Sequence, residues 1–329
     1  MARSPSRGWD VSPSVRLLLE PLWALAHERR TWSPRLFPRV VWCALHSIGS
    51  HREILRVLTF PEFGELTRDY PRFAFKCLMQ DYLARGFTVK ARASSFINHY
   101  SWLHEKLPSA FVERLLREKV PLVVIHHSLN VFTIDCAFAG FVDKEGELEL
   151  RLNVGDERVF TLSFTVVPGW VVKSKAQNVL LISRLHGVKG NAIQMRLVYR
   201  TMHGAGPSAV LLTALQGIGN ATGIDTLACI AAANQPAYRE ARAASFHDVY
   251  DRLFETRGIC MNAADVFLSP IPMEEKPLSQ FRRSLRQRAL NRRELKRILS
   301  EAVCRAFSDI DGGDLSPKQI LLEPAPRIV

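Results

Sequence analysis

The chain has 329 residues, of which 47% are hydrophobic and 23% charged. This composition excludes a wholly disordered chain, and the length leaves room for about two domains. The formal net charge is +12, which favours an anionic partner such as nucleic acid, lipid head groups or a phosphorylated ligand. The longest apolar stretch, Val120 to Phe141, is interrupted by His126 and Asp135. It falls short of the ~18 uninterrupted apolar residues of a transmembrane segment, so none is expected.

Six cysteines are scattered along the chain without a CxxC pair: Cys43, Cys77, Cys136, Cys229, Cys260 and Cys304. No secretory signal is expected, because charge and proline interrupt the apolar residues near the N-terminus. Unpaired spacing argues against a thiolate metal site. The pattern predicts reduced, mostly buried thiols in a cytoplasmic protein, with no bound metal.

Residues 1–35 are rich in Ser, Pro and Arg and predict a mobile arm with one short helix at Ser14–Arg29. Residues 36–118 show helical periodicity, with prolines between the predicted helices. One apolar stripe of this region has i, i+4, i+7 spacing and consists of Phe96, Ile97, Tyr100 and Leu103. The sequence therefore predicts an N-terminal helical region.

From Val120 the hydrophobic period changes from 3.6 to 2. Residues 148–154 and 160–166 alternate apolar with polar, which is typical of half-buried antiparallel strands. Turns are expected at 144–146 and at Gly155-Asp156, because glycine and small polar residues favour hairpin connections.

After this meander the pattern predicts strands alternating with helices. The expected strands are Val179–Leu185, Thr226–Ala231 and Asp265–Leu268, and the expected helices are Ala192–His203, Ser208–Thr222 and Gln235–Arg257. Such alternation favours parallel neighbours, because a parallel crossover needs a helix-length connection. An antiparallel meander that leads into this unit matches the element order of the N-acetyltransferase (GNAT) fold. The predicted fold class is α+β, with a GNAT-like mixed sheet and flanking helices at 119–275.

Residues 276–308 predict a basic C-terminal helix, followed by a mobile tail at 309–329. The second half of this helix is amphipathic and is expected to pack against the rest of the protein. The arginines expected to bind an anionic partner are Arg282, Arg283, Arg286, Arg288, Arg292 and Arg293. Nucleic acid and anionic lipid are both candidate partners, and a merely solvated face is the alternative.

Several motifs resemble the bacterial VirK/YbjX family. They are Arg184 to Gly190, Tyr199 to Gly204, Tyr250-Asp251, Asn98 to Leu103, and the Arg-rich helix that begins near Phe281. The resemblance covers roughly His51 to Phe307. It implies a bacterial protein associated with virulence or envelope stress, and it implies no defined enzymatic activity.

The loop after the strand at 179–185 is the first candidate site. Glycines between a strand and a helix can present main-chain N–H groups to a phosphate. Arg184, Gly187 and Gly190 resemble the acetyltransferase motif Q/R-x-x-G-x-G/A, with one extra residue before the last glycine. The residues expected to bind the phosphates of an acyl-CoA are Arg184, Gly187, Lys189, Gly190 and Asn191; a tight structural turn is the alternative.

Asn234 and Tyr250 are the candidate catalytic residues. In acetyltransferases an Asn follows the fifth strand, and a Tyr on the next helix often protonates the departing thiolate. A helix cap at Asn234 and a packing role for Tyr250 are the alternatives.

Two hypotheses follow for the function. In the first, the protein is an acyl-CoA-dependent acyltransferase or a degenerate ligand-binding relative of one. In the second, it is a non-enzymatic factor whose basic helix binds an anionic partner. A splay between the strands at 180–184 and 226–230 would favour the first hypothesis.

Overall fold

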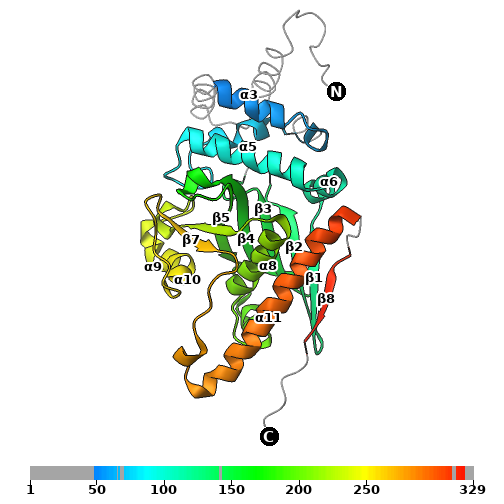
Figure 1. The fold of residues 1–329 in the computed structure, drawn as a ribbon, viewed down its shortest axis with the longest axis vertical. Helices are drawn as coiled ribbons and strands as arrows, with labels where there is room; N and C mark the ends of the chain where they lie inside the picture. The colour runs from blue at the N-terminus through cyan, green and yellow to red at the C-terminus, as the bar shows by residue number, and fades with distance from the viewer. Residues whose placement is uncertain (1–47, 65, 67–69, 141–142, 313–315, 323–329) are drawn as a thin grey trace, which may run out of the picture.

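The computed structural model describes residues 48–322, except 65, 67–69, 141–142 and 313–315. The predicted arm at 1–35 lies outside these residues. Helices form a layer across one end of a central sheet, and two long helices cover one face of that sheet (Figure 1). The fold is therefore a mixed α+β arrangement, which confirms the predicted class.

The N-terminal layer confirms the helical region within the described residues. It contains α3 (Ile48–Val57), η2 (Pro61–Phe63), η3 (Pro71–Leu78), α5 (Val89–Lys106) and α6 (Ser109–Arg117). The Thr88 hydroxyl caps α5 by accepting a hydrogen bond from the Ala91 N–H at 3.2 Å. The predicted stripe of α5 lies inward, because Phe96, Tyr100 and Leu103 are all buried.

The sheet has eight strands in the order β7-β6-β5-β4-β3-β2-β1-β8. Their bounds are β1 (Val120–His127), β2 (Asn130–Phe138), β3 (Leu148–Val154), β4 (Glu157–Pro168), β5 (Asn178–Gly187), β6 (Thr226–Ile230), β7 (Val266–Pro270) and β8 (Lys318–Leu321). β1 to β5 form the predicted antiparallel meander. β5 and β6 are parallel neighbours, also as predicted.

The prediction of a third parallel strand is wrong, because β7 runs antiparallel to β6. Ile230 pairs with Val266, so the connection leaves and re-enters the sheet at the same end. The single long helix expected at Gln235–Arg257 is also broken. Pro236 supplies no N–H near its start. The helical segments that form are η5 (Ala232–Asn234), η6 (Glu240–Arg242), α9 (Ala243–Val249) and α10 (Asp251–Glu255), each too short to cross the sheet.

The C-terminal tail was expected to be mobile, but part of it forms β8. This strand pairs in parallel with β1, and Ile320 lies opposite Ile125 with its side chain buried. Lys318 also pairs with Asp309 at 2.7 Å. Main-chain pairing with a distant strand orders this short segment, and local pattern gave no sign of it.

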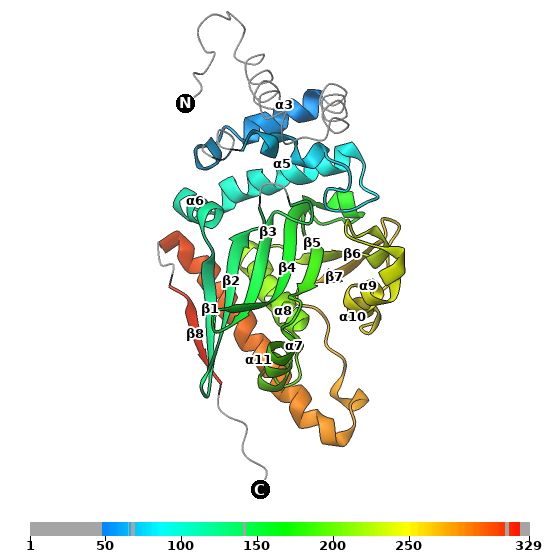
Figure 2. The ribbon, with the colours of Figure 1, turned by 180° about the vertical axis from the view of Figure 1, so that it is seen from behind.

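One face of the sheet is covered by α8 (Pro207–Thr222) and α11 (Arg283–Ser308) (Figure 1). α7 (Ala192–Thr201) lies beyond the end of β5 (Figure 2). The predicted apolar stripe of α11 docks as expected, since Leu295, Leu299 and Val303 are buried. At Gly217 an added Cβ would lie 2.6 Å from the Ser300 carbonyl oxygen. The glycine therefore allows α8 and α11 to approach closely.

The opposite face of β2, β3 and β4 is turned toward the viewer in Figure 2, with α8 and α11 behind the strands. Charged and polar side chains occupy it and pair with one another, both across strands and within β3. Asn153 donates to Asp135 at 2.7 Å, and the Arg151 Nε donates to Glu149 at 2.5 Å.

A buried charged cluster joins the helical layer to the sheet. The Lys76 ammonium lies 3.0 Å from a carboxylate oxygen of Glu147, and both side chains are at most 1% exposed. Tyr82 donates to the other carboxylate oxygen at 2.5 Å, and Tyr100 also donates to Glu147. Lys76 further donates to the Gly140 carbonyl at 3.0 Å. Every charge in the cluster has partners, which is the condition for burying an ion pair.

Among residues 48–322, outside the gaps, no helix combines the length and the apolar character that a bilayer crossing demands.

Candidate functional site

The pairing between strands β5 and β6 stops before the carboxyl end of β5. They pair at three positions, the last of which joins Ile182 to Cys229. Beyond it β5 continues to Gly187, whereas β6 ends at Ile230 and the chain turns away into η5. The main-chain groups of β5 after Ile182 therefore face a gap on this side instead of a strand. The pairing thus stops because β6 ends one residue after its last pair, so the splay that the acyltransferase hypothesis expects between these strands stays a prediction.

On its other side β5 carries a bulge. Ser163 of β4 pairs with Arg184, and Phe164 pairs with Ile182, so Ser183 is the extra residue. The Ser183 hydroxyl donates to the Glu145 carbonyl at 2.9 Å. A bulge bends and twists its strand, and this one lies where β5 separates from β6.

Tyr250 lies in the gap. Its hydroxyl oxygen accepts a hydrogen bond from the Leu185 N–H at 3.1 Å, and the residue is 6% exposed. Burial raises the pKa of the phenol well above its ordinary value. The hydroxyl is thus protonated at neutral pH. The oxygen accepts from β5, so the phenol keeps its own proton.

Asn234 ends η5 at the edge of the same region. Its side-chain amide donates to the Asp265 carboxylate at 3.3 Å, and its main-chain carbonyl accepts from the Arg85 main-chain N–H at 3.0 Å. Nearby, Asp251 accepts from the Ala232 N–H at 2.7 Å. These contacts hold the turn after β6 against the start of β7. Asn234 therefore has a positioning role here, and no helix begins at it.

The Arg184 guanidinium is bound by side chains of the protein, not by a phosphate. Its guanidinium lies 2.7 Å from Asp143, 3.1 Å from Glu145 and 3.4 Å from Glu149. It also donates to the Ser163 hydroxyl at 3.0 Å. These carboxylates raise the pKa of Arg184 further. The predicted motif thus contributes its arginine to the polar face of the sheet.

The rest of the predicted loop leads from β5 into α7. Gly190 has φ +96°, a conformation that favours glycine. Asn191 precedes α7 and donates from its side chain to the Arg158 carbonyl at 2.7 Å. Lys189 is exposed. Gly187 ends β5 beside Phe160 and Met195. Gly187, Lys189, Gly190 and Asn191 are therefore adjacent to the gap, and Arg184 faces the other way.

The predicted basic residues lie on the first half of α11 and its N-cap. Arg282, Arg283, Arg286 and Arg288 are exposed, and Arg292 and Arg293 are partly buried. Arg288 lies over the Tyr199 ring at 5.1 Å, and Arg292 over the Phe281 ring at 5.7 Å. Within the described part of the chain, none of these six arginines forms an ion pair with a carboxylate.

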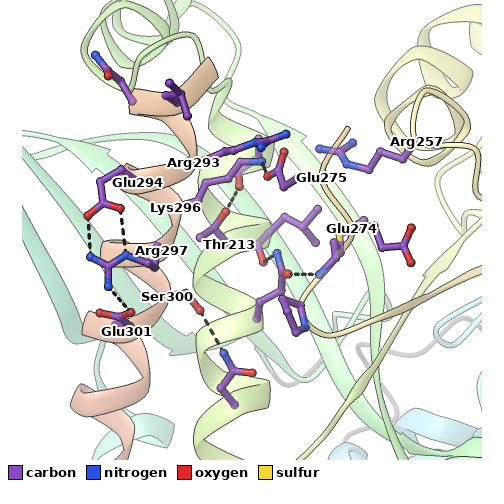
Figure 3. A pocket seen from close by; sticks show the side chains of 18 residues that line it. Thr213, Arg257, Glu274, Glu275, Arg293, Glu294, Lys296, Arg297, Ser300 and Glu301 are labelled. Atoms are coloured by element: carbon purple, nitrogen blue, oxygen red, sulfur yellow. Dashed lines mark hydrogen bonds and ion pairs between the residues drawn. The ribbon is translucent and has the colours of Figure 1, made fainter. Parts of the chain in front are cut away.

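A pocket that the sequence did not indicate lies between α8, the middle of α11 and residues 272–275 (Figure 3). Its volume is about 660 Å³. The lining combines apolar residues of α8 with charged residues of α11 and with Arg257. Its parts are far apart in the chain. The only local signal is the pair Glu274-Glu275 directly before a basic helix.

Three cysteines are buried: Cys77, Cys136 and Cys229. Burial raises their pKa values, that of Cys136 to about 12, so these thiols are unreactive at neutral pH. Among the residues that the structure describes, no group of three or more His, Cys, Asp and Glu side chains could hold a metal ion.

A family model described as a protein of unknown function (DUF535) matches residues 37–303. The match spans the helical layer, the sheet up to β7 and most of α11. No curated protein and no solved structure gives a significant match.

Proposed function

The chain belongs to the DUF535 family, whose function is unknown, and from this premise we propose that it is a cytoplasmic acyltransferase. Its acyl donor is an acyl-coenzyme A, and its site is the gap between β5 and β6. The single observation that carries the proposal is the hydrogen bond from the Leu185 N–H of β5 to the Tyr250 hydroxyl, just beyond the last paired position of the two parallel strands.

The gap suits a thioester with an extended amide chain. Main-chain N–H and C=O groups of β5 after Ile182 have no partner strand on this side, although the Tyr250 hydroxyl already binds the Leu185 N–H. The pantetheine arm of coenzyme A carries two amides, and it can add to β5 as a further strand would. The exposed loop of Lys189 and Gly190 at the end of β5 would then meet the phosphates.

Tyr250 would act on the leaving group. A nucleophilic nitrogen or oxygen attacks the thioester carbonyl, its bond to carbon forms and the C–S bond breaks. The departing thiolate takes the Tyr250 proton. The proton that the nucleophile loses then restores the phenol. The Tyr250 phenol is protonated at neutral pH, as this step requires.

The element order supports a GNAT-like fold: an antiparallel meander, a parallel pair of strands joined by helices, and a final antiparallel strand. Two helices, α7 and α8, connect β5 with β6, where one is usual in the acetyltransferase superfamily. The VirK/YbjX resemblance extends the proposal to a bacterial role in virulence or envelope stress.

The test is stabilisation by thioesters. Coenzyme A and a panel of acyl-CoAs at ~100 times the dissociation constant should each raise the free energy of unfolding by about 2.7 kcal/mol. Lys189→Ala should weaken this effect. No stabilisation by any of these ligands would overturn the proposal.

A second test separates binding from catalysis. Tyr250→Phe should keep coenzyme A binding and lower the rate of free-thiol release by roughly 10²–10⁴-fold. Tyr199→Phe is the matched control, because Tyr199 is an exposed tyrosine on α7. Equal rates for the wild type and Tyr250→Phe would remove Tyr250 from the mechanism.

A second candidate function rests on the unpaired arginines of α11. Binding of a DNA duplex or of anionic vesicles should weaken steeply with salt, since each phosphate contact adds about −0.9 to the log–log slope for DNA. Replacing Arg282, Arg283, Arg286 and Arg288 by Gln should abolish binding. Binding that ignores both salt and these changes would exclude this function.

A further inference from the structure

The pocket beside α11 is separate from the gap at β5. Ala209, Leu212 and Thr213 of α8 and Met273 form its more apolar side. The charged side chains of α11 stand along one wall and Arg257 along the other (Figure 3).

The pocket is held in shape by contacts across all its walls. The Met273 N–H donates to the Gln216 side chain at 2.7 Å, which ties residues 272–276 to α8. Lys296 forms an ion pair with Glu275, and the Arg293 guanidinium donates to the Lys276 carbonyl. Ser300 accepts from Asn220 at 3.4 Å. Because these contacts exist without a ligand, little ordering would be needed on binding.

Charges on the two sides of the pocket differ. On one side Arg297 is bound by Glu294 and Glu301, each at 2.6 Å. On the side nearer residues 272–276, Arg257 from one wall donates to the Leu253 carbonyl and Arg293 from the α11 wall donates to the Lys276 carbonyl, so neither guanidinium ends on a carboxylate. Only Lys296 has an acidic partner there.

The nearby acids do not restore the balance. Glu275 is already bound to Lys296. The Glu274 side chain points away from the basic groups (Figure 3). Burial lowers the pKa values of both Arg257 and Lys296; Glu275 opposes this effect, and the positive charge of Arg292 adds to it. This side of the pocket therefore holds positive charges in excess, partly shielded from water, and a bound anion would relieve their repulsion.

We propose that the pocket binds a phosphate-bearing ligand with an apolar part, whose phosphate oxygens are held by Arg257, Arg293 and Lys296. Guanidinium groups match phosphate oxygens in geometry and charge. The apolar part of the ligand lies against Leu212 and Met273. This site is independent of the acyltransferase proposal, since it shares no residue with the gap at β5.

Calorimetry at constant ionic strength tests this proposal with three probes: inorganic phosphate, octyl phosphate below its micelle concentration, and octyl glucoside. Octyl phosphate should bind at least tenfold more tightly than inorganic phosphate, and octyl glucoside should not bind. Equal affinity for the two phosphates would contradict the apolar part of the ligand and leave a site for free phosphate. Binding of octyl glucoside alone, or of no probe, would overturn the proposal.

Variants locate the binding. Arg257→Gln and, separately, Arg293→Gln should each lower the affinity for octyl phosphate at least tenfold. Arg297→Gln is the matched control, because Arg297 lines the same pocket but is bound by two carboxylates. Tyr250→Phe should leave this affinity unchanged, which distinguishes failure here from failure of the acyltransferase proposal. Unchanged affinity in both Arg257→Gln and Arg293→Gln, or an equal loss in Arg297→Gln, would overturn the assignment of the phosphate to Arg257 and Arg293.

Discussion

Two clusters of charge in this protein contrast in how their charges are matched. Between the helical layer and the sheet, Lys76 meets Glu147 together with two tyrosine hydroxyls and a main-chain carbonyl. Beside α11, Arg257 and Arg293 meet only main-chain carbonyls, and Lys296 has the single carboxylate of Glu275. The first cluster is fully buried, and the second lines an open pocket.

The difference separates structure from binding. A fully buried charge must find its counter-charge within the protein, because desolvation costs several kcal/mol per ion. A partly exposed cluster can leave charge uncompensated and obtain the missing counter-charge from a ligand. Changes at the first cluster should therefore act on stability, and changes at the second on affinity.

The largest expected effect comes from breaking the matched cluster. Lys76→Met leaves Glu147 buried without its cation and should lower the free energy of unfolding by about 3–5 kcal/mol, measured by urea denaturation. In the double variant with Glu147→Gln no charge remains, so part of this stability should return. A loss below about 1 kcal/mol in Lys76→Met would mean that the cluster is not charged as described.

A smaller effect is expected where α8 supports the pocket. Gly217→Ala puts a Cβ 2.6 Å from the Ser300 carbonyl oxygen and 2.8 Å from the Val303 Cβ, so α11 must shift. Overpacking of this kind costs about 1–3 kcal/mol, measurable by thermal denaturation, and octyl phosphate should bind more weakly. Gly49→Ala in α3 is the control, since an added Cβ there meets nothing within 4 Å. An unchanged melting temperature would show that the two helices separate freely.

An effect that appears only at acid pH concerns His99, a neutral neighbour of the matched cluster. Burial, and then the charge of Lys76, lower its pKa to about 3. Above pH 6.5 the imidazole is neutral in both the folded and the unfolded chain. As the pH falls below 6.5, the His99 imidazole of the unfolded chain binds a proton, whereas that of the folded chain stays neutral until about pH 3. His99 therefore lowers the free energy of unfolding by up to about 1.4 kcal/mol per pH unit in this window.

Urea denaturation between pH 7 and pH 4 measures this slope. His99→Gln should reduce it, because glutamine does not titrate, whatever the variant does to stability at pH 7. His104→Gln is the control, since His104 is partly exposed and ion-paired with Glu62. An identical slope in the wild type and His99→Gln would contradict the assignment.

The local elements of this fold were predictable. The alternation at 148–154 and 160–166 predicted β3 and β4, and helical periodicity predicted α5, α8 and the docked half of α11. These patterns work because each side chain's direction depends only on its near neighbours in the chain. For the same reason, Tyr250 and the loop at Gly187–Gly190 could be named as candidates from their positions after predicted strands.

Only the tertiary structure decided how distant segments meet. It made β7 antiparallel, paired the tail with β1 as β8, and turned Arg184 toward Asp143, Glu145 and Glu149. It also brought Arg257 against α11 to form the pocket. Each outcome depends on pairing or charge compensation between residues far apart in the chain. Such contacts depend on the free energy of the whole fold, and the local hydrophobic periodicity of the sequence does not predict them.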